Sequence, residues 1–129
     1  MIMKQSIMER IKTFEDALAL ADEKTREEFL RSLEGYNTKD EIAYKKLKLI
    51  TKVINEGWVA DYKNFNQIKY YLWGGLLYSG AYSGLLFARC SNSSGDTIVH
   101  LGSRLNFKSR EIAEYVGNQF IDLWNDYLL

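Results

Sequence analysis

The 129-residue sequence contains no proline, one cysteine and one histidine, and its 17 acidic residues balance 17 basic residues. A single cysteine excludes an internal disulfide framework and is typical of a reducing compartment. One cysteine and one histidine are also too few for a structural zinc site of the usual kind. A net charge of zero argues against a DNA-binding domain of the strongly basic kind.

Long apolar runs are absent as well, since none approaches the roughly 20 residues that cross a bilayer. The first residues, Met1-Ile2-Met3-Lys4, lack the apolar region and cleavage site of a secretory signal. The length fits a single domain over residues 1–129, and 47% apolar residues is typical of a globular chain. We therefore expect a soluble, cytoplasmic protein that does not contact a membrane.

Residues 1–56 carry 11 acidic and 11 basic side chains, a density typical of solvated helices. A spacing of three and four predicts one helix face made of Ile7, Ile11, Phe14, Leu18 and Ala21. A short helix over 25–33 should follow and stop at Gly35. Thr38 and Glu41 form a capping-box pattern that predicts a helix over 39–55.

The composition changes after Gly57, which is expected to end that helix in a left-handed conformation. Ten of the 18 aromatic residues lie in 57–110. Stretches rich in aromatic and branched residues, separated by glycine- and serine-rich turns, predict three antiparallel strands over 68–78, 85–91 and 97–107. Ser109 should begin a final helix that packs on the sheet. The expected fold class is α+β: N-terminal helices, a three-stranded antiparallel β-meander, and a C-terminal helix.

The segment 102–120 reads G-S-R-L-N-F-K-S-R-E-I-A-E-Y-V-G-N-Q-F. It resembles a recurrent ending, approximately G-S-R-L-x-F-K-S-x-E-x-A-E-Y-x-G-x-x-F, of small uncharacterised proteins encoded by phages and prophages of gut bacteria. The upstream strings I-N-E-G-W at 54–58 and Y-Y-L-W at 70–73 resemble that group too. The resemblance transfers no activity. It implies a compact accessory protein in the cytoplasm of a bacterial host cell, and it leaves a virion component open.

Three cations and a serine cluster where the final helix is expected to begin: Arg104, Lys108, Ser109 and Arg110. A helix N-terminus has unpaired amides and a partial positive charge, so added cations make a seat for a phosphate or carboxylate. The alternative is that Ser109 only caps the helix and the cations pair with acids such as Glu111 and Glu114.

The net charge of zero hides two segments of opposite charge. Residues 57–110 carry a net charge of +4, and residues 111–129 carry a net charge of −4. Basic residues interleaved with aromatic ones can hold phosphates and stack bases. The aromatic residues concerned are Tyr70, Tyr71, Trp73, Tyr78 and Tyr82. The alternative for them is core or cross-strand packing. A nucleotide or nucleic-acid binding module is therefore our second hypothesis. A further basic stripe (Lys45, Lys48 and Lys52) is interpreted as a solvated helix face.

The same aromatic residues favour an interaction surface, where tyrosine, tryptophan and arginine are enriched. The uncharged run L-W-G-G-L-L at 72–77 would be a poor strand edge to leave in water. Our leading hypothesis is a non-catalytic phage or mobile-element accessory protein that binds a macromolecular partner, either another protein or itself as a homo-oligomer. Cys90 and His100 would share a sheet face only as diagonal neighbours, and no phosphate-binding loop motif occurs, so we expect neither enzyme activity nor a cofactor or metal.

Overall fold

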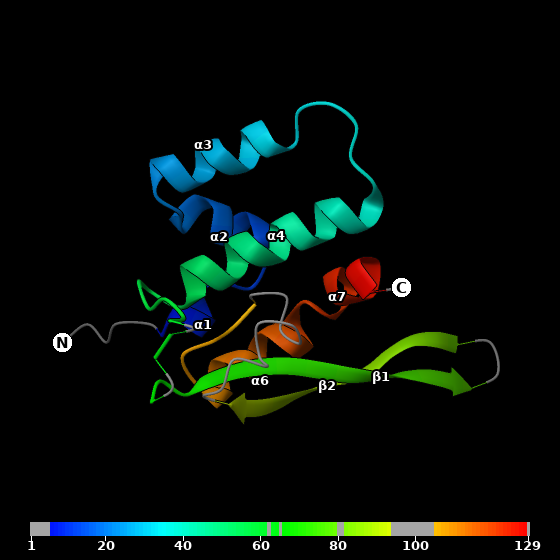
Figure 1. Ribbon diagram of the computed structural model, residues 1–129. Helices are drawn as coiled ribbons and strands as arrows, with labels where there is room; N and C mark the ends of the chain where they lie inside the picture. The colour runs from blue at the N-terminus through cyan, green and yellow to red at the C-terminus, as the bar shows by residue number, and fades with distance from the viewer. Residues whose placement is uncertain (1–5, 62, 65, 80–81, 94–104, 129) are drawn as a thin grey trace.

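The computed structural model describes residues 6–61, 63–64, 66–79, 82–93 and 105–128, with the backbone alone for residues 73–79, 82–93 and 128. The described chain is mostly helical (Figure 1). Its elements in chain order are α1 (Ile7–Arg10), α2 (Phe14–Leu20), α3 (Glu23–Ser32), α4 (Lys39–Ile54), β1 (Lys69–Ser79), β2 (Tyr82–Ser93), α6 (Arg110–Gln119) and α7 (Ile121–Leu128). Within these residues, every helix is too short or too polar to cross a bilayer.

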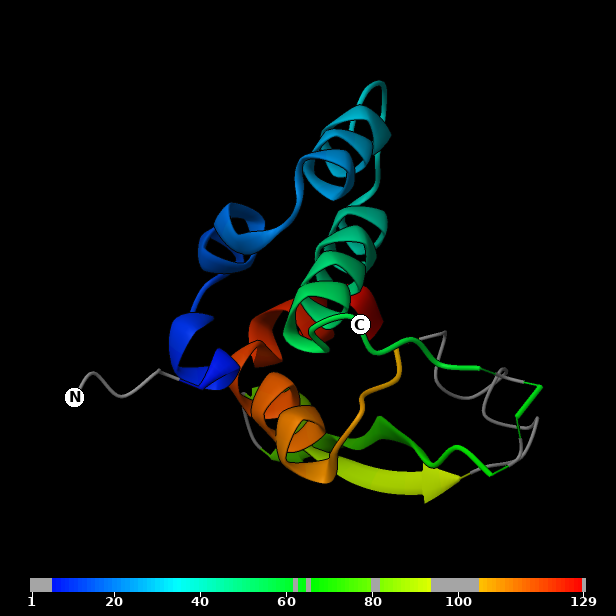
Figure 2. The ribbon, with the colours of Figure 1, turned by 90° about the vertical axis from the view of Figure 1, so that its left-hand side faces the viewer.

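The elements are stacked in layers, which Figures 1 and 2 show from two directions. Helix α4 lies between α3 on one side and the C-terminal helices α6 and α7 on the other. The hairpin of β1 and β2 forms the last layer, and α6 and α7 pack on it. The helices therefore cover one face of the hairpin.

The hydrophobic core lies where α4, α6 and the extended segment before α6 meet. Its most buried side chains, each at most 2% exposed, are Ile11, Leu47, Ile50, Ile54, Leu105, Phe107 and Val116. They belong to one cluster that joins residues from both sides of Gly57. Burial of each large side chain stabilises the fold by about 1.5–3 kcal/mol, so neither half of the chain has a complete core without the other.

The prediction of one helix face across residues 7–21 is wrong in one respect. The segment forms two helices, α1 and α2, with a break at Ile11–Thr13. The Thr13 hydroxyl accepts from the Asp16 amide at 3.1 Å, and the Asp16 carboxylate accepts from the amides of Lys12 at 3.0 Å and Thr13 at 3.1 Å. These bonds satisfy the free amides of a new helix start. They also hold the pKa of the Asp16 carboxyl below its ordinary value, chiefly through the Lys12 amide.

The predicted helix over 39–55 is confirmed as α4, which the Thr38 hydroxyl caps by accepting from the Glu41 amide at 3.4 Å. The chain leaves α4 through two left-handed residues, Glu56 with φ 50° and Gly57 with φ 90°. The helix expected over 25–33 begins two residues earlier, since Asp22 caps α3 by accepting from the Thr25 amide at 2.7 Å. Local capping chemistry thus decides each of these helix boundaries.

The predicted three-stranded antiparallel meander is wrong, because the described residues contain a sheet of two strands, β1 and β2. These strands pair from Lys69 opposite Ser93 to Ser79 opposite Tyr82, with an irregularity between Gly74 and Leu76. The strands run through glycines and serines that the sequence suggested were loops. Most of the segment expected to form the third strand, residues 97–104, lies outside the described residues.

The end of that expected strand, Leu105–Phe107, contributes only an isolated bridge to β1 instead of a strand. Phe107 and Tyr70 exchange two backbone hydrogen bonds, of 2.8 and 3.1 Å. Leu105 and Phe107 are buried in the core. The buried Asn55 side chain, at the end of α4, donates to the Asn106 carbonyl at 2.8 Å. The segment is therefore held against α4 by side-chain packing and this hydrogen bond, with only one bridge to the sheet.

The single closing helix expected after Ser109 is also wrong, because it is divided into α6 and α7 at Phe120. Phe120 is only 6% exposed and has φ −113° and ψ 34°, which are not helical angles. Beyond this change of direction the Tyr127 ring stacks on Tyr44 of α4, with ring centroids 5.0 Å apart. The division thus lets α7 pack on α4 as well as on the hairpin.

Two side chains of α6 join the C-terminal part of the fold to the break between α1 and α2. The Tyr115 hydroxyl donates to the Ile11 carbonyl at 2.6 Å, and the Gln119 amide donates to the Lys12 carbonyl at 2.8 Å. Partial burial raises the pKa of the Tyr115 hydroxyl, and the nearby Asp16 carboxylate adds to this. The carbonyls left free by the helix break therefore gain partners from about 100 residues further along the chain.

Candidate functional site

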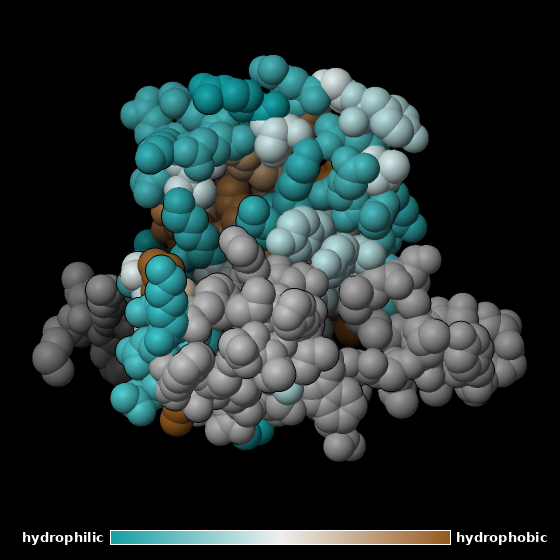
Figure 3. Space-filling model, in the orientation of Figure 1, coloured by the Kyte–Doolittle hydropathy of each residue, from teal (hydrophilic) through white to brown (hydrophobic). Residues whose placement is uncertain are grey.

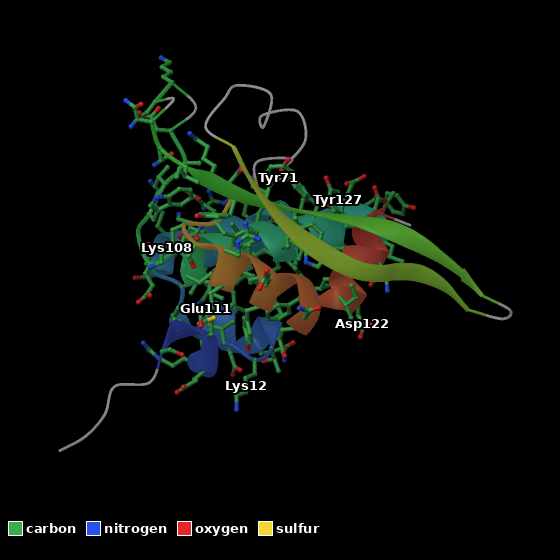
Figure 4. The ribbon with its side chains drawn as sticks, turned by 90° about the horizontal axis from the view of Figure 1, so that it is seen from below. Lys12, Tyr71, Lys108, Glu111, Asp122 and Tyr127 are labelled. Carbon is green, nitrogen blue, oxygen red and sulfur yellow. The ribbon has the colours of Figure 1, made fainter. Side chains whose placement is uncertain are left out.

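The first candidate site is the start of α6, where the sequence places an anion seat. Ser109 caps the helix, its hydroxyl accepting from the Ile112 amide at 3.2 Å. The Lys108 ammonium pairs with Glu56 at 3.4 Å, and the Arg110 guanidinium lies 3.9 Å from the Glu114 carboxylate. Figure 4 labels Lys108 and Glu111 at this end of α6. Arg104 lies outside the described residues.

The backbone at this junction is held by Asn55. Asn55 Oδ1 accepts from the Lys108 backbone amide at 3.1 Å, and Asn55 Nδ2 donates to the Asn106 carbonyl at 2.8 Å. Asn55 is 3% exposed, so both hydrogen bonds are sheltered from water. The described cations at the junction have carboxylates as neighbours, and this geometry resembles the structural alternative more than an open anion seat. These contacts favour a structural role for the junction, and the predicted anion seat is untested.

The second candidate is the aromatic run of the hairpin. Tyr70 and Tyr71 are half-buried at the base of β1, and Tyr70 packs against the core together with Leu72. Successive residues of a strand face opposite sides, so Tyr71 belongs to the face turned away from that packing. For the other three aromatic residues only the backbone is described: Trp73 is opposite Arg89, Tyr78 opposite Ser83, and Tyr82 opposite Ser79. The five residues therefore extend along the whole hairpin and do not form one compact base-stacking platform at its base.

The described residues between α4 and β1 hold the start of β1 through the Lys69 side chain. The fully buried Lys69 ammonium donates to the carbonyls of Asn64 at 3.2 Å and Gln67 at 3.1 Å. The Gln67 side chain in turn accepts from the Asp61 amide at 2.6 Å and donates to the Val59 carbonyl at 3.0 Å. This hydrogen-bonded segment fixes the start of β1. It also leaves Val59 and Ile68 exposed, at 77% and 50% of their surface.

The far end of the hairpin extends past the helices, as the views of Figures 1 and 4 both show. In sequence, the 19 residues from Tyr70 to Ala88 contain no charged side chain. Beyond the Tyr70–Phe107 bridge, the described residues provide no further backbone partner strand for either edge of the hairpin. Unpaired edges without charge are a ready template for pairing with another strand.

Cys90 and His100 are the two residues that the sequence offers for nucleophilic chemistry. Cys90 is opposite Leu72 in the hairpin register, whereas His100 lies outside the described residues. No group of three or more histidine, cysteine, aspartate or glutamate side chains suited to a metal occurs in the described part of the chain. The expectation that Cys90 and His100 are diagonal neighbours on one sheet face therefore falls partly outside the described residues.

The acidic face of the C-terminal helices contributes one contact between helices. Asp126 of α7 pairs with Lys39 at the start of α4, at 3.1 Å, while Glu111 and Asp122 are exposed. Figure 4 shows Glu111 and Asp122 on α6 and α7, respectively. Of the four acidic residues that give 111–129 its net charge of −4, Asp126 is therefore paired with α4.

Comparisons with known proteins give no relative from which a function could be transferred. The chain matches no protein-family model, no curated protein and no solved structure.

Proposed function

We propose that this is a non-catalytic binding protein that acts on a macromolecular partner as a homo-oligomer, assembled through the β1–β2 hairpin. The observation that carries the proposal is the charge-free run Tyr70–Ala88, which forms most of a hairpin extending past the helices. The resemblance of 102–120 to phage and prophage proteins supports a role as an accessory factor of such an element in the bacterial cytoplasm.

The length of the hairpin supports pairing between copies. Strands β1 and β2 have 11 and 12 residues, whereas a typical strand has about five or six. A two-stranded hairpin is marginally stable in water by itself, and α6 and α7 pack on only one of its faces. Pairing with a second hairpin would place one unpaired edge of each copy in the interior of a four-stranded sheet. Self-association therefore gives these strands the backbone partners that they need.

The edge of β2 is the better candidate for this pairing. At its base, β1 already exchanges two backbone hydrogen bonds with Phe107. Within the described residues, β2 pairs with β1 alone. An antiparallel β2–β2 contact is self-complementary and closes a two-fold dimer, the commonest symmetry of homo-oligomers. Charge repulsion between two β2 strands would be small, since Tyr82–Ser93 contains Arg89 as its sole charged residue.

Analytical ultracentrifugation tests the proposal over a range of protein concentrations. We expect a mass of twice the 15.0 kDa chain for the unaltered protein. Leu85→Lys and Leu86→Lys each add a charge to the hairpin, and because they are adjacent in a strand they affect opposite faces. At least one of them should shift the protein to a monomer while the circular dichroism of the helices is retained.

Tyr36→Lys is the matched control, because Tyr36 is 91% exposed and lies in the connection between α3 and α4. It should leave the mass unchanged. A monomer at every concentration of the unaltered protein would contradict the proposal, as would full retention of the oligomer by both leucine variants.

A further inference from the structure

Helices α3 and α4 enclose a groove on the side of the molecule away from the hairpin. The groove holds a cavity of about 360 Å³. Its apolar part is formed by Phe29 and Leu49, which are 8% and 4% exposed. Figure 3 shows apolar surface between hydrophilic side chains in the region of these helices. The groove thus combines an apolar base with a polar rim.

Three lysines of α4 line this groove: Lys45, Lys48 and Lys52. Two of them are tied to α3 at its opposite ends. The Lys45 ammonium donates to the Ser32 carbonyl and to the Asn37 side-chain oxygen, both at 2.5 Å, and the Lys52 ammonium donates to the Thr25 hydroxyl at 2.7 Å. These acceptors are neutral, so the bonds position the two positive charges without cancelling them.

Lys48 lies between these two lysines in sequence and is exposed. Its ammonium is 5.6 Å from the centre of the Tyr44 ring on the same helix, a contact that places the charge without neutralising it. None of the three lysines forms an ion pair with another described residue. An ammonium has three hydrogen-bond donors, so unused donors remain on all three.

The acidic groups at the groove are fewer than the basic ones. Glu28 is the one carboxylate among the lining residues. Asp22 lies near one end, where it caps α3, and its pKa is lowered chiefly by the Thr25 amide and to a smaller extent by Lys52. Three ammonium groups therefore face one lining carboxylate, and the groove has an excess of positive charge.

We propose that the α3–α4 groove binds an acidic amphipathic helix of a protein partner. Two antiparallel helices leave a furrow along which a third helix can lie, with its apolar side over the exposed edges of Phe29 and Leu49 at the base of the groove. Lys45, Lys48 and Lys52 follow one another at three and four residues, so they repeat at about one helical turn of 5.4 Å. Glutamates one turn apart on the partner would match them. This site is separate from the hairpin, and its occupancy does not depend on oligomerisation.

The apolar base is what favours a peptide over a nucleic acid. A phosphate backbone needs cations on an accessible surface, and its bases need exposed aromatic faces for stacking. Phe29 is the one aromatic residue that lines the groove, and with 8% of its surface exposed it offers an edge to an apolar side chain but no open face on which a base could stack. A leucine-rich helix face with flanking carboxylates is the better chemical match to this groove.

The test uses a synthetic helical peptide with leucines on one face and glutamates one turn apart beside them, together with its glutamine analogue. Isotope-edited NMR should locate binding of the acidic peptide at the amides of α3 and α4. Fluorescence anisotropy should give an affinity about five- to tenfold weaker for the glutamine analogue, and weaker binding of the acidic peptide at high salt.

Lys48→Glu is the decisive variant, because Lys48 is exposed and has no bond to α3 that the fold needs. This variant should bind the acidic peptide about tenfold more weakly, while its circular dichroism stays unchanged. Lys63→Glu makes the same charge change at an exposed lysine between α4 and β1 and should have no effect. Equal affinity for both peptides, unchanged binding by Lys48→Glu, or shifts confined to other elements would overturn the proposal. Tighter binding of a thymidine oligonucleotide at the same amides would overturn the class of partner.

Discussion

Asn55 holds the backbone of Lys108 in place across 53 residues of sequence, its Oδ1 accepting from the Lys108 amide at 3.1 Å. The same side chain donates to the Asn106 carbonyl at 2.8 Å. A single buried amide thus satisfies a donor and an acceptor of the segment that runs into α6. It connects the end of α4 to the start of α6.

Replacing Asn55 with alanine should be strongly destabilising. The change leaves one buried amide and one buried carbonyl without partners, and each costs about 1–3 kcal/mol. We expect the free energy of unfolding in urea to fall by about 2–4 kcal/mol. Asn118→Ala is the matched control, since Asn118 is exposed and, among the described residues, bonds to the Glu114 carbonyl of its own helix alone. It should change stability by less than about 0.5 kcal/mol, and a similar loss in both variants would refute this role for Asn55.

Acid should weaken the start of α2 through Asp16. The pKa of this carboxyl lies below its ordinary value of 3.8, chiefly because it accepts from the Lys12 amide. A carboxyl with a lowered pKa in the folded protein stabilises the fold above the unfolded value, and that stability is lost as the pH falls through the folded value. Asp16→Asn should therefore show a smaller fall in melting temperature between neutral and acidic pH. Glu27→Gln, on the exposed side of α3, should keep the full fall.

Gly57 should tolerate asparagine better than alanine. Its φ of 90° is left-handed, and a Cβ at this position would meet no atom within 4 Å. The cost of a side chain is therefore backbone strain without a steric clash. Alanine should lower the free energy of unfolding by about 1–2 kcal/mol, and asparagine, which enters this conformation more readily, by less. Equal losses in thermal denaturation would indicate that the left-handed backbone is not the cause.

Lys45 and Lys52 should be needed to hold α3, whereas Lys48 should not. Helix α3 buries only Thr25 and Phe29, so the bonds from Lys45 to Ser32 and from Lys52 to Thr25 form a large part of its attachment to α4. Lys45→Ala and Lys52→Ala should each raise hydrogen exchange in α3 by about three- to tenfold. Lys48→Ala should leave exchange unchanged, and identical effects of all three variants would contradict the distinction.

Nucleotides should give no stabilisation that depends on Lys108. Its ammonium pairs with Glu56, and Arg110 lies beside Glu114, so both charges are already balanced. Thermal unfolding with ATP or with a short oligonucleotide should be the same for the unaltered protein and for Lys108→Ala after correction for the variant's own stability. A rise in melting temperature that Lys108→Ala or Arg104→Ala abolishes would instead support the anion seat.

The sequence predicted those parts of the fold that depend on neighbouring residues. The helix over 39–55 and the left-handed Gly57 follow from capping residues and apolar spacing, and both are confirmed. The start of α2 was missed although Thr13 and Asp16 carry its signal. A continuous apolar face across Ile7–Ala21 suggested one helix, and the capping box prevailed over that periodicity.

The sheet was predicted wrongly because its extent depends on distant contacts. Leu105–Phe107 has the composition of a strand, yet it is buried against the core and bonded to Asn55, 51 residues away from Asn106. The sequence around residues 105–107 does not indicate a hydrogen-bond partner so far away in the chain. The bonds from two of the groove lysines to α3 were missed for a similar reason. Lys45 and Lys52 resembled a solvated stripe because their acceptors, the Ser32 carbonyl and the Thr25 hydroxyl, belong to a separate helix.

The bonds from Tyr115 and Gln119 to the break between α1 and α2 have a consequence for how the chain folds during its synthesis. The carbonyls of Ile11 and Lys12 gain these donors only after 104 and 107 further residues, respectively, have been added. Val116 and Phe107, which complete the same core, also emerge late. The N-terminal helices must therefore remain incompletely packed on the ribosome, and the native structure forms only when α6 is available to close it.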